Sequence, residues 1–269
     1  TASDPVADSP ESSAKEAPAI LAADYYVSTG GSDGNNGSED KPFRTIKKAI
    51  AAAGAGDLIY VRGGTYRLSG ELRIRKDGAP GKPIRLFAYP GEKPVLDASG
   101  YRGQDAAIWM TDAKYWHFRG LEIANSPYHG LVVTGSSSDN VFEALDIHGN
   151  GRTETAGSGV HISGSASNNL FLNVDSHHNV DTTKGNADGF ALKNADARNN
   201  TFRGCRAWNN SDDGWDFWNG APTVIENSLA WKNGYNDAGK PMGDGNGFKL
   251  GQGAGRHRIT NSMAWDNKQ

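Results

Sequence analysis

The sequence contains a single cysteine, Cys205, in 269 residues, and this scarcity excludes two kinds of scaffold. One thiol cannot build a disulfide framework or the thiolate set of a structural zinc site. No apolar run approaches the roughly 18 residues that a membrane-spanning helix needs, so we expect no membrane span. Basic residues are not in excess either, because 28 Lys and Arg face 31 Asp and Glu. Without a broad positive field we expect no nucleic-acid partner.

Hydrophobic residues make up 36% of the chain, which is enough to bury a core. Residues 1–23 are rich in Ser, Ala, Pro and acidic side chains, and we expect them to form a flexible leader. The chain begins at Thr1 with neither an initiator Met nor a hydrophobic leader. We therefore expect an exported protein, either secreted or held at the cell surface or in the periplasm of a bacterial type of cell.

Residues 24–269 are expected to form one domain made almost entirely of short strands. Segments such as LIYVRGGTY, PIRLFAYPG and PVLDASG are rich in strand-forming residues and are separated by Gly and Pro turns. The exception is a helical pattern near the start of the domain, with Phe43, Ile46, Ala49, Ile50 and Ala53 on one face. The pattern predicts one short amphipathic helix in an all-β domain.

An internal repeat becomes visible when the segments HGLVV, SGVHI, DGFAL, DGWDF and NGFKL are aligned. The aligned glycines, at spacings of 25 to 33 residues, are Gly130, Gly159, Gly189, Gly214 and Gly247. A second signature in each repeat aligns Asn150, Asn179, Asn210, Asn233 and Asn267, and Asn125 is expected to extend this series backward. Short strands with Gly and Asn in fixed columns predict a parallel β-helix in which each repeat forms one coil.

Stacked coils bring equivalent residues about 4.8 Å apart, so the asparagine amides can bond along the axis. We expect the column glycines to adopt turns with positive φ. We expect two aromatic columns to pack in the core: one of Trp208, Trp231 and Trp265, and one of Phe190, Trp215 and Phe248. The helix around Ile46 is expected to cap the N-terminal end of the stack.

Two columns carry polar residues that an inert coil does not need. The position before each Gly is held by His129, Ser158, Asp188, Asp213 and Asn246, and the position two residues after it by Val132, His161, Ala191, Asp216 and Lys249. Together with Asp212, four aspartates meet on two adjacent coils, and Lys249 lies one coil beyond Asp216. Clustered carboxylates need a cation, and Ca²⁺ prefers such hard oxygen ligands. A lysine that loses its proton can act as a strong base.

Ordinary structural roles compete with these assignments. Asp-Gly is a common turn dipeptide, and Asp33, Asp77 and Asp244 precede glycines in what we interpret as ordinary loops. Further residues beside the site are His161, Lys193, Arg206 and Trp218, and for each of them we favour a structural or merely exposed position over a substrate-binding one.

The motifs NADGFALK, NSDDGWDFW and GDGNGFKLG resemble those of polysaccharide lyase family 9, the calcium-dependent pectate lyases. The resemblance extends from Asp24 to the last residue. It implies a right-handed parallel β-helix in which Asp188, Asp212, Asp213 and Asp216 bind one Ca²⁺ and Lys249 is the Brønsted base. The sequence ends at SMAWDNKQ, within a coil pattern that usually continues in family members, so we expect a chain that is either truncated at its C-terminus or unusually short.

The implied reaction is β-elimination on pectate (polygalacturonate), giving 4,5-unsaturated products, and we expect a monomer that binds this anionic cell-wall polymer. Three alternatives stay open at this point. In the first, the protein is a lyase of the same fold that acts on rhamnogalacturonan or another uronic-acid glycan. In the second, it is a β-helix glycoside hydrolase that needs no metal. In the third, it is a noncatalytic carbohydrate-binding β-helix with a structural Ca²⁺.

Overall fold

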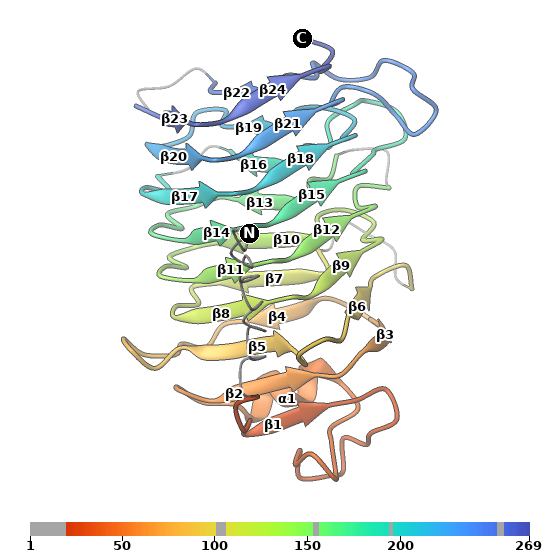
Figure 1. The fold of residues 1–269 in the computed structure, drawn as a ribbon, viewed down its shortest axis with the longest axis vertical. Helices are drawn as coiled ribbons and strands as arrows, with labels where there is room; N and C mark the ends of the chain where they lie inside the picture. Colours follow the sequence, from red (N-terminus) through yellow and green to blue (C-terminus); the bar gives the residue numbers. More distant parts are fainter. Residues whose placement is uncertain (1–19, 101–105, 153–155, 194–195, 252–255) are drawn as a thin grey trace, which may run out of the picture.

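The structure, a computed structural model, describes residues 20–100, 106–152, 156–193, 196–251 and 256–269. Most of the expected leader, residues 1–19, lies outside these ranges. Within them the chain forms three parallel sheets of nine, eight and seven strands that stack as successive coils (Figure 1). The predicted β-helix is therefore confirmed. No helix in the described ranges has the length and apolar character that crossing a membrane requires.

Each coil contributes one strand to each sheet over most of the stack. The nine-stranded sheet contains β1 (Tyr25–Val27), β2 (Leu58–Val61), β5 (Ile84–Ala88), β8 (Trp116–Arg119), β11 (Val141–Glu143), β14 (Leu170–Leu172), β17 (Asn200–Arg203), β20 (Thr223–Glu226) and β23 (Arg258–Thr260). The eight-stranded sheet contains β3 (Gly64–Arg67), β6 (Pro94–Asp97), β9 (Glu122–Ala124), β12 (Asp146–His148), β15 (Asp175–His177), β18 (Arg206–Trp208), β21 (Leu229–Trp231) and β24 (Met263–Trp265). The seven-stranded sheet contains β4 (Leu72–Ile74), β7 (Ile108–Thr111), β10 (Leu131–Thr134), β13 (Val160–Ile162), β16 (Phe190–Leu192), β19 (Trp215–Asp216) and β22 (Phe248–Lys249).

The predicted helix is α1 (Ile46–Ala52), at the N-terminal end of the stack (Figure 1). Thr45 caps it by accepting a hydrogen bond from the Lys48 backbone N–H, as helix N-caps commonly do. Ile46, Ala49 and Ile50 are buried and belong to the main hydrophobic core. The predicted apolar face is thus confirmed, and the helix covers core residues at the end where the coils begin.

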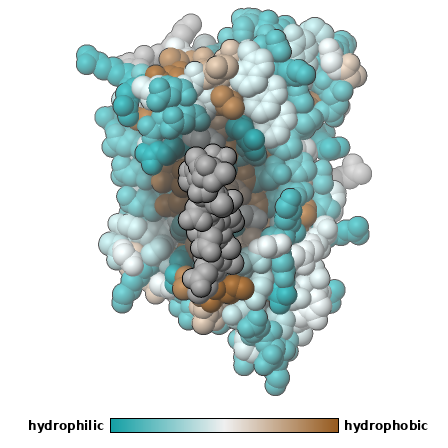
Figure 2. All heavy atoms as spheres, viewed as in Figure 1, coloured by the Kyte–Doolittle hydropathy of each residue, from teal (hydrophilic) through white to brown (hydrophobic). Residues whose placement is uncertain are grey.

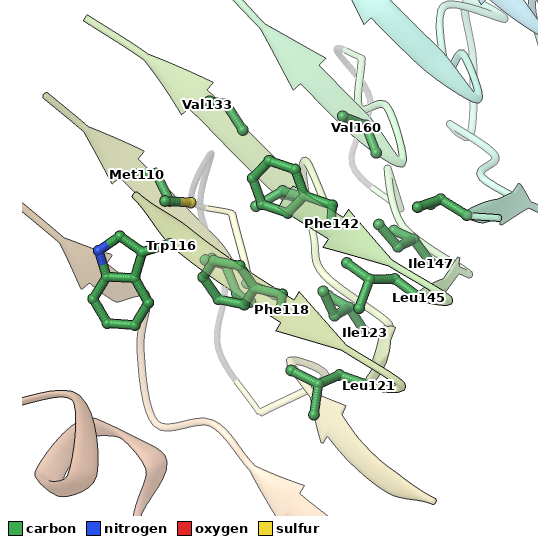
Figure 3. Close-up of a cluster of buried hydrophobic side chains, with 14 of the residues drawn as sticks. Met110, Trp116, Phe118, Leu121, Ile123, Val133, Phe142, Leu145, Ile147 and Val160 are labelled. Atoms are coloured by element: carbon green, nitrogen blue, oxygen red, sulfur yellow. The ribbon is translucent and has the colours of Figure 1, made fainter. Parts of the chain in front are cut away.

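The core lies between the three sheets and is built from columns of like residues. In the nine-stranded sheet Phe118, Phe142, Phe171 and Phe202 stack with ring centroids 5.3, 4.7 and 4.8 Å apart. Figure 3 shows the first two of these rings beside aliphatic side chains from neighbouring strands. The predicted column in the seven-stranded sheet is confirmed, because Phe190 and Trp215 are fully buried and Phe248 packs partly buried against the core, 4.8 Å from the Trp215 ring.

The predicted tryptophan column exists, but it lies on the outside of the eight-stranded sheet. Trp208 stacks on Trp231 at 4.8 Å, and Trp231 on Trp265 at 5.1 Å. Residues alternate between the two faces of a strand, and the small Ala207 and Ala230 take the inward positions beside these rings. Trp265 is 39% exposed. The expectation of a core stack was therefore wrong.

The asparagine ladder is confirmed from Asn150 to Asn267. Each amide nitrogen donates to the side-chain oxygen of the next ladder residue at 2.9 Å, and that oxygen also accepts the backbone N–H one coil earlier. The ladder position before Asn150 belongs to Ser126, whose N–H donates to Asn150 Oδ1 at 2.9 Å. Asn125 is one residue too early, and its side chain donates to Asp97 instead. The backward extension to Asn125 was wrong.

A second ladder, which the sequence analysis missed, links the coils at another bend. Asn140 donates to Asn169 at 2.9 Å and Asn169 to Asn200 at 3.0 Å, with all three side chains buried. The Trp116 backbone N–H donates to Asn140 Oδ1 at 2.9 Å. Buried amides are therefore hydrogen-bonded from coil to coil at two corners of the solenoid.

The column glycines are required by close packing and not by backbone conformation. None of the five has a positive φ, so that expectation was wrong. A Cβ on Gly159 would lie 2.7 Å from Asn179 Nδ2, and one on Gly189 would lie 2.9 Å from Asn210 Nδ2. Positive φ values recur at other bends, including those into the eight-stranded sheet at Gly120, Ala144, Asn173, Gly204, Asn227 and Asn261.

We predict that Asn179→Ala lowers the stability of the solenoid by about 2–4 kcal/mol. The substitution leaves the Asn150 N–H and amide without their partner. It also removes one of the two hydrogen bonds that the Asn210 side-chain oxygen accepts from residue 179, since the backbone N–H remains. The midpoint and slope of urea-induced unfolding would measure the change. Asn36→Ala, which removes one exposed hydrogen bond, is the control and should differ little from the parent. Equal midpoints for the two variants would show that the ladder does not hold the coils.

Candidate functional site

The site lies on the outer face of the seven-stranded sheet, behind the sheets in the foreground of Figure 1. Figure 2 shows the opposite face, where hydrophilic residues predominate among those coloured by hydropathy. Strand pairing aligns Val132, His161, Ala191, Asp216 and Lys249 across five coils. The alternating strand residues point inward, and Trp215 is fully buried beside Asp216. The predicted register of this column is therefore confirmed.

The structure brings together the four aspartates that the sequence analysis singled out. Asp188, Asp213 and Asp216 are 0 to 2% exposed, and each offers an oxygen within 4.8 Å of the others. Asp212 is 7% exposed and forms a second such group with Asp213 and Asp244. Asp244 therefore joins the cluster and does not belong to an ordinary turn, contrary to our interpretation of the sequence.

Backbone and amide groups hold one oxygen of three of these carboxylates. Asp188 Oδ1 accepts the Asp213 N–H at 3.2 Å, and Asp212 Oδ1 accepts the Asp244 N–H at 2.7 Å. Asp213 Oδ1 accepts both the N–H and the amide of Asn246, at 2.7 and 2.8 Å. Asp216 differs, because its Oδ1 is buried and has no hydrogen-bond partner among the described residues. A buried carboxylate oxygen without a partner is costly, and it indicates a ligand at this position.

Two lysines contact the remaining oxygens. Lys249 Nζ lies 3.0 Å from Asp213 Oδ2, 2.9 Å from Asp244 Oδ2 and 3.4 Å from Asp216 Oδ2. Lys193 Nζ lies 3.1 Å from Asp188 Oδ2 and also bonds Asp216 Oδ2. Lys193 was set aside in the sequence analysis as structural or exposed. Its long side chain instead brings a second positive charge into the acidic cluster.

Burial and mutual repulsion disfavour the ionised forms of Asp188 and Asp212. Burial raises the pKa of Asp188 well above its usual value, although the positive charge of Lys193 opposes this shift. Burial, together with the charge of Asp213, raises the pKa of Asp212 to about 7. Burial opposes the charged form of Lys249, but hydrogen bonds to Asp244 and Asp213 outweigh it and raise the pKa of this lysine. Without a bound cation, Lys249 is therefore an ammonium ion.

A buried carboxylate organises the loop that leads to Asp188. Asp181 is 1% exposed and accepts the backbone N–H groups of residues 183–186. This places Gly185 against Gly243, where a Cβ on Gly185 would lie 2.2 Å from the Gly243 nitrogen. A Cβ on Gly243 would in turn lie 2.3 Å from Asp212 Oδ1. The two loops therefore meet at Asp212 with no room for larger residues, and sequence spacing alone did not indicate a role for Asp181.

The cluster opens into a cavity of about 610 Å³, a size that suits a small ligand. Its lining includes Asp188, Asp212, Asp216, Asp244, Lys193 and Lys249, and further residues on other coils, among them Tyr128, His129, Ser158, His161 and Trp218. Three of the four residues that the sequence analysis set aside thus line the cavity. Arg206 does not, because it pairs with Asp175 on the outer face of the eight-stranded sheet.

The fold and the cluster define a parallel β-helix protein whose outer face carries a group of buried carboxylates that could hold a metal ion. A family model described as "Pel9A-like, right handed beta helix region" matches residues 25–269. The chain belongs to this Pel9A-like right-handed β-helix family. The predicted fold, its handedness and the predicted family are thereby confirmed.

Several relatives of known fold or name support this assignment. Pectate lyase PEL9 of Emericella nidulans is 38% identical over 93% of this chain and 69% of its own length. Pectate lyase L of Dickeya chrysanthemi is 38% identical over 90% of this chain, which spans 59% of that relative. The crystal structure of pectate lyase Pel9A superposes with a TM-score of 0.79 at 36% identity, over 90% of this chain and 63% of that one. These names agree with the predicted polysaccharide lyase class.

A rhamnogalacturonan lyase structure is also similar, with a TM-score of 0.78 at 28% identity. It covers 91% of this chain and 68% of the other. The shared fold therefore accompanies lyases named for two different pectic polymers.

We predict that Asp181→Ala loosens the loop over the acidic cluster. Amide hydrogens of residues 183–186 should exchange at least about tenfold faster, because several hydrogen bonds to one carboxylate are lost together. Hydrogen exchange followed by mass spectrometry on a peptide covering this loop would measure the change. The exposed Asp196→Asn is the control. Unchanged exchange in Asp181→Ala would mean that other contacts hold the loop.

Proposed function

We propose that this chain is a calcium-dependent pectate lyase that cleaves polygalacturonate by β-elimination. The observation that carries the proposal is the buried Asp216, whose free Oδ1 lies in a cluster of acidic residues directly beside Lys249. Family membership and the pectate lyase relatives support the same reaction. The fold also leaves the site at an open cavity where a polymer can lie.

Asp188, Asp212, Asp213 and Asp216 would hold the calcium ion. They supply only carboxylate oxygens, which are hard donors, and within the described residues these groups include no cysteine or histidine ligand. The unpartnered Asp216 Oδ1 fits a cation ligand. When bound, Ca²⁺ would compensate these carboxylates, favour the neutral form of Lys249 and draw electron density from the C6 carboxylate of a uronate unit, which makes its C5 proton more acidic.

The chain's own residues would then carry out the proton transfer. Lys249 projects from β22 on the same outward column as Asp216, so its amine can reach a sugar held at the cluster. The amine takes the C5 proton, and the C5–H electron pair forms the C4–C5 double bond. The C4–O bond breaks, and the leaving oxygen takes up a proton from water. The product carries a 4,5-unsaturated end.

Two other functions fit the site less well. A glycoside hydrolase needs a carboxylic acid and a second carboxylate on opposite sides of the scissile bond, whereas these aspartates crowd one buried cluster with two lysines. A noncatalytic binding protein has no need of a lysine between three carboxylates. Within the lyase class, rhamnogalacturonan is the alternative substrate, because the rhamnogalacturonan lyase structure is nearly as similar as pectate lyase Pel9A.

A pectate lyase meets its polymer outside the cell, so we further propose that the protein is exported, in agreement with the expectation from the sequence. We also propose that it acts as a monomer. The four aspartates and Lys249 of the proposed site come together within one chain, so the site needs no residue from a second copy.

We predict that the protein acting on polygalacturonate with Ca²⁺ produces a rise in absorbance near 235 nm, and that EDTA abolishes it. Lys249→Ala should lower kcat about 10²- to 10⁴-fold, the usual contribution of a general base. Lys47→Ala, at an exposed position of α1, should leave the rate unchanged. Rhamnogalacturonan assayed in parallel would decide between the two substrates. Cleavage that persists in EDTA without a 235 nm chromophore would identify a hydrolase and contradict the proposal.

We also predict that Asp216→Asn weakens Ca²⁺ binding about 10- to 100-fold, in the range seen for damaged metal sites. The amide keeps the size of the side chain but removes its charge from the buried position. Calorimetric titration of metal-free protein with CaCl₂ would give both dissociation constants, and Asp237→Asn serves as the control. Binding in the parent should also raise Tm, because Ca²⁺ stabilises only the folded site. Equal affinities for parent and Asp216→Asn would remove Asp216 from the ligand set.

A further inference from the structure

The cavity beside the acidic cluster is longer than a single sugar unit needs. Its lining begins at Tyr128 and His129, before β10, and continues through His161 and Asp216 to Lys249 on β22. These strands belong to five successive coils, and a rise of about 4.8 Å per coil gives a length on the order of 20 Å. A polymer lying along the coil axis would therefore place more than one unit in the cavity.

His161 lines this long cavity from the second of its five coils. It lies on the same outward column as Asp216, two coils earlier, and the residue between them is Ala191. Ala191 has no polar group in its side chain. Two coil steps of about 4.8 Å place the backbones of His161 and Asp216 about 10 Å apart. That spacing leaves the acidic cluster and His161 as two distinct polar positions on one line.

The hydrogen-bonding capacity of His161 is not met within the described residues. Neither ring nitrogen has a hydrogen-bond partner there, and Nδ1 is shielded from solvent. The neighbouring His129 differs, since its Nδ1 accepts the backbone N–H of Ser158 at 2.9 Å. Buried polar side chains are nearly always satisfied by protein, water or ligand, so an unpartnered imidazole at the wall of a cavity indicates a ligand contact.

The imidazole is also held in a fixed position and a fixed charge state. Its ring stacks on that of His129 at 4.4 Å, with 28° between the planes, and its backbone lies in the middle of β13. Burial and the positive charge of Lys193 lower the pKa of His161 to about 4. The ring is therefore neutral near neutral pH, with one nitrogen that donates and one that accepts a hydrogen bond. A sugar hydroxyl, which also both donates and accepts, matches this pair.

We propose that His161 binds a hydroxyl group of the uronate unit next to the one whose carboxylate lies at the acidic cluster. This inference rests on the proposed function, because it takes the ligand to be a uronic-acid polymer. It assigns the stretch of the cavity around Tyr128, His129 and His161 as a second sugar-binding subsite. A neutral hydrogen-bonding residue there, distant from the cation ligands, would bind the sugar without attracting its carboxylate away from the cluster.

Binding of trigalacturonate in the presence of Ca²⁺ tests the inference, with Lys249→Ala as the parent so that no turnover occurs. In this parent, His161→Ala should weaken trigalacturonate binding about tenfold by isothermal titration calorimetry, as expected for one lost hydrogen bond to a buried group. His161→Gln retains a donor and an acceptor and should recover affinity to within about threefold of the parent. His148→Ala is the matched control, because it removes a histidine from the outer face of the eight-stranded sheet.

A purely structural histidine would give a different pattern. If His161 only supports its neighbours through stacking on His129, His161→Ala should disturb Ca²⁺ affinity and trigalacturonate affinity together. We expect the Ca²⁺ dissociation constant to stay within twofold. In the enzyme that keeps Lys249, His161→Ala should raise KM for polygalacturonate more than it lowers kcat.

Two outcomes would overturn the subsite. One is trigalacturonate affinity in His161→Ala within twofold of the parent, and the other is an equal loss of Ca²⁺ affinity. Both leave the lyase proposal intact provided that the protein with Lys249 still produces the 235 nm absorbance. An absence of that absorbance on both pectic polymers would instead remove the proposed function, and the subsite with it.

Discussion

The close contact between each column glycine and the ladder asparagine of the same coil determines where the functional side chains lie. Gly189 passes so near to Asn210 that a single added carbon would collide with its amide, and Gly159 meets Asn179 in the same way. Each ladder amide is bonded to the coils before and after it, so the height of every coil is set from both sides. Because Asp188 and Asp213 directly precede column glycines, this contact also fixes the distance between their carboxylates.

Such fixed stacking allows the fold to bury charge that would otherwise be unfavourable. Buried carboxylates in a cluster repel one another and lose their hydration, so such a cluster by itself destabilises the fold. Backbone N–H groups donate to the Oδ1 atoms of Asp188, Asp212 and Asp213. Lys193 and Lys249 contact the Oδ2 atoms of Asp188 and Asp213. The site can therefore form before a cation binds, and Asp216 Oδ1 is left available for it.

Residues that recur at the same position of each repeat could be predicted from the sequence. Residues whose place depends on side-chain length, on a loop or on a one-residue offset could not. Asp188, Asp213, Asp216 and Lys249 follow from the alignment of repeats, because parallel coils convert equal sequence positions into neighbours. The prediction for Asn125 was wrong because the bend there places Ser126 on the ladder. The prediction for the tryptophans was wrong because strand alternation turns their side chains outward. Asp244 and Lys193 enter the cluster through a loop and a long side chain, and column alignment describes neither.

The two lysines of the cluster are not equivalent, because a ligand on the buried oxygens would affect their carboxylate partners differently. Lys193 is paired in the described structure with Asp188 and Asp216, both buried, so any ligand that takes those oxygens also takes its partners. Lys249 shares Asp216 with Lys193 and pairs with Asp213, but it also bonds Asp244, whose side chain is 59% exposed. Competition for the buried oxygens thus leaves Lys249 anchored near the cavity by its contact with Asp244. The residue on β22 is consequently the one that keeps its position beside the cluster when a ligand takes the buried oxygens.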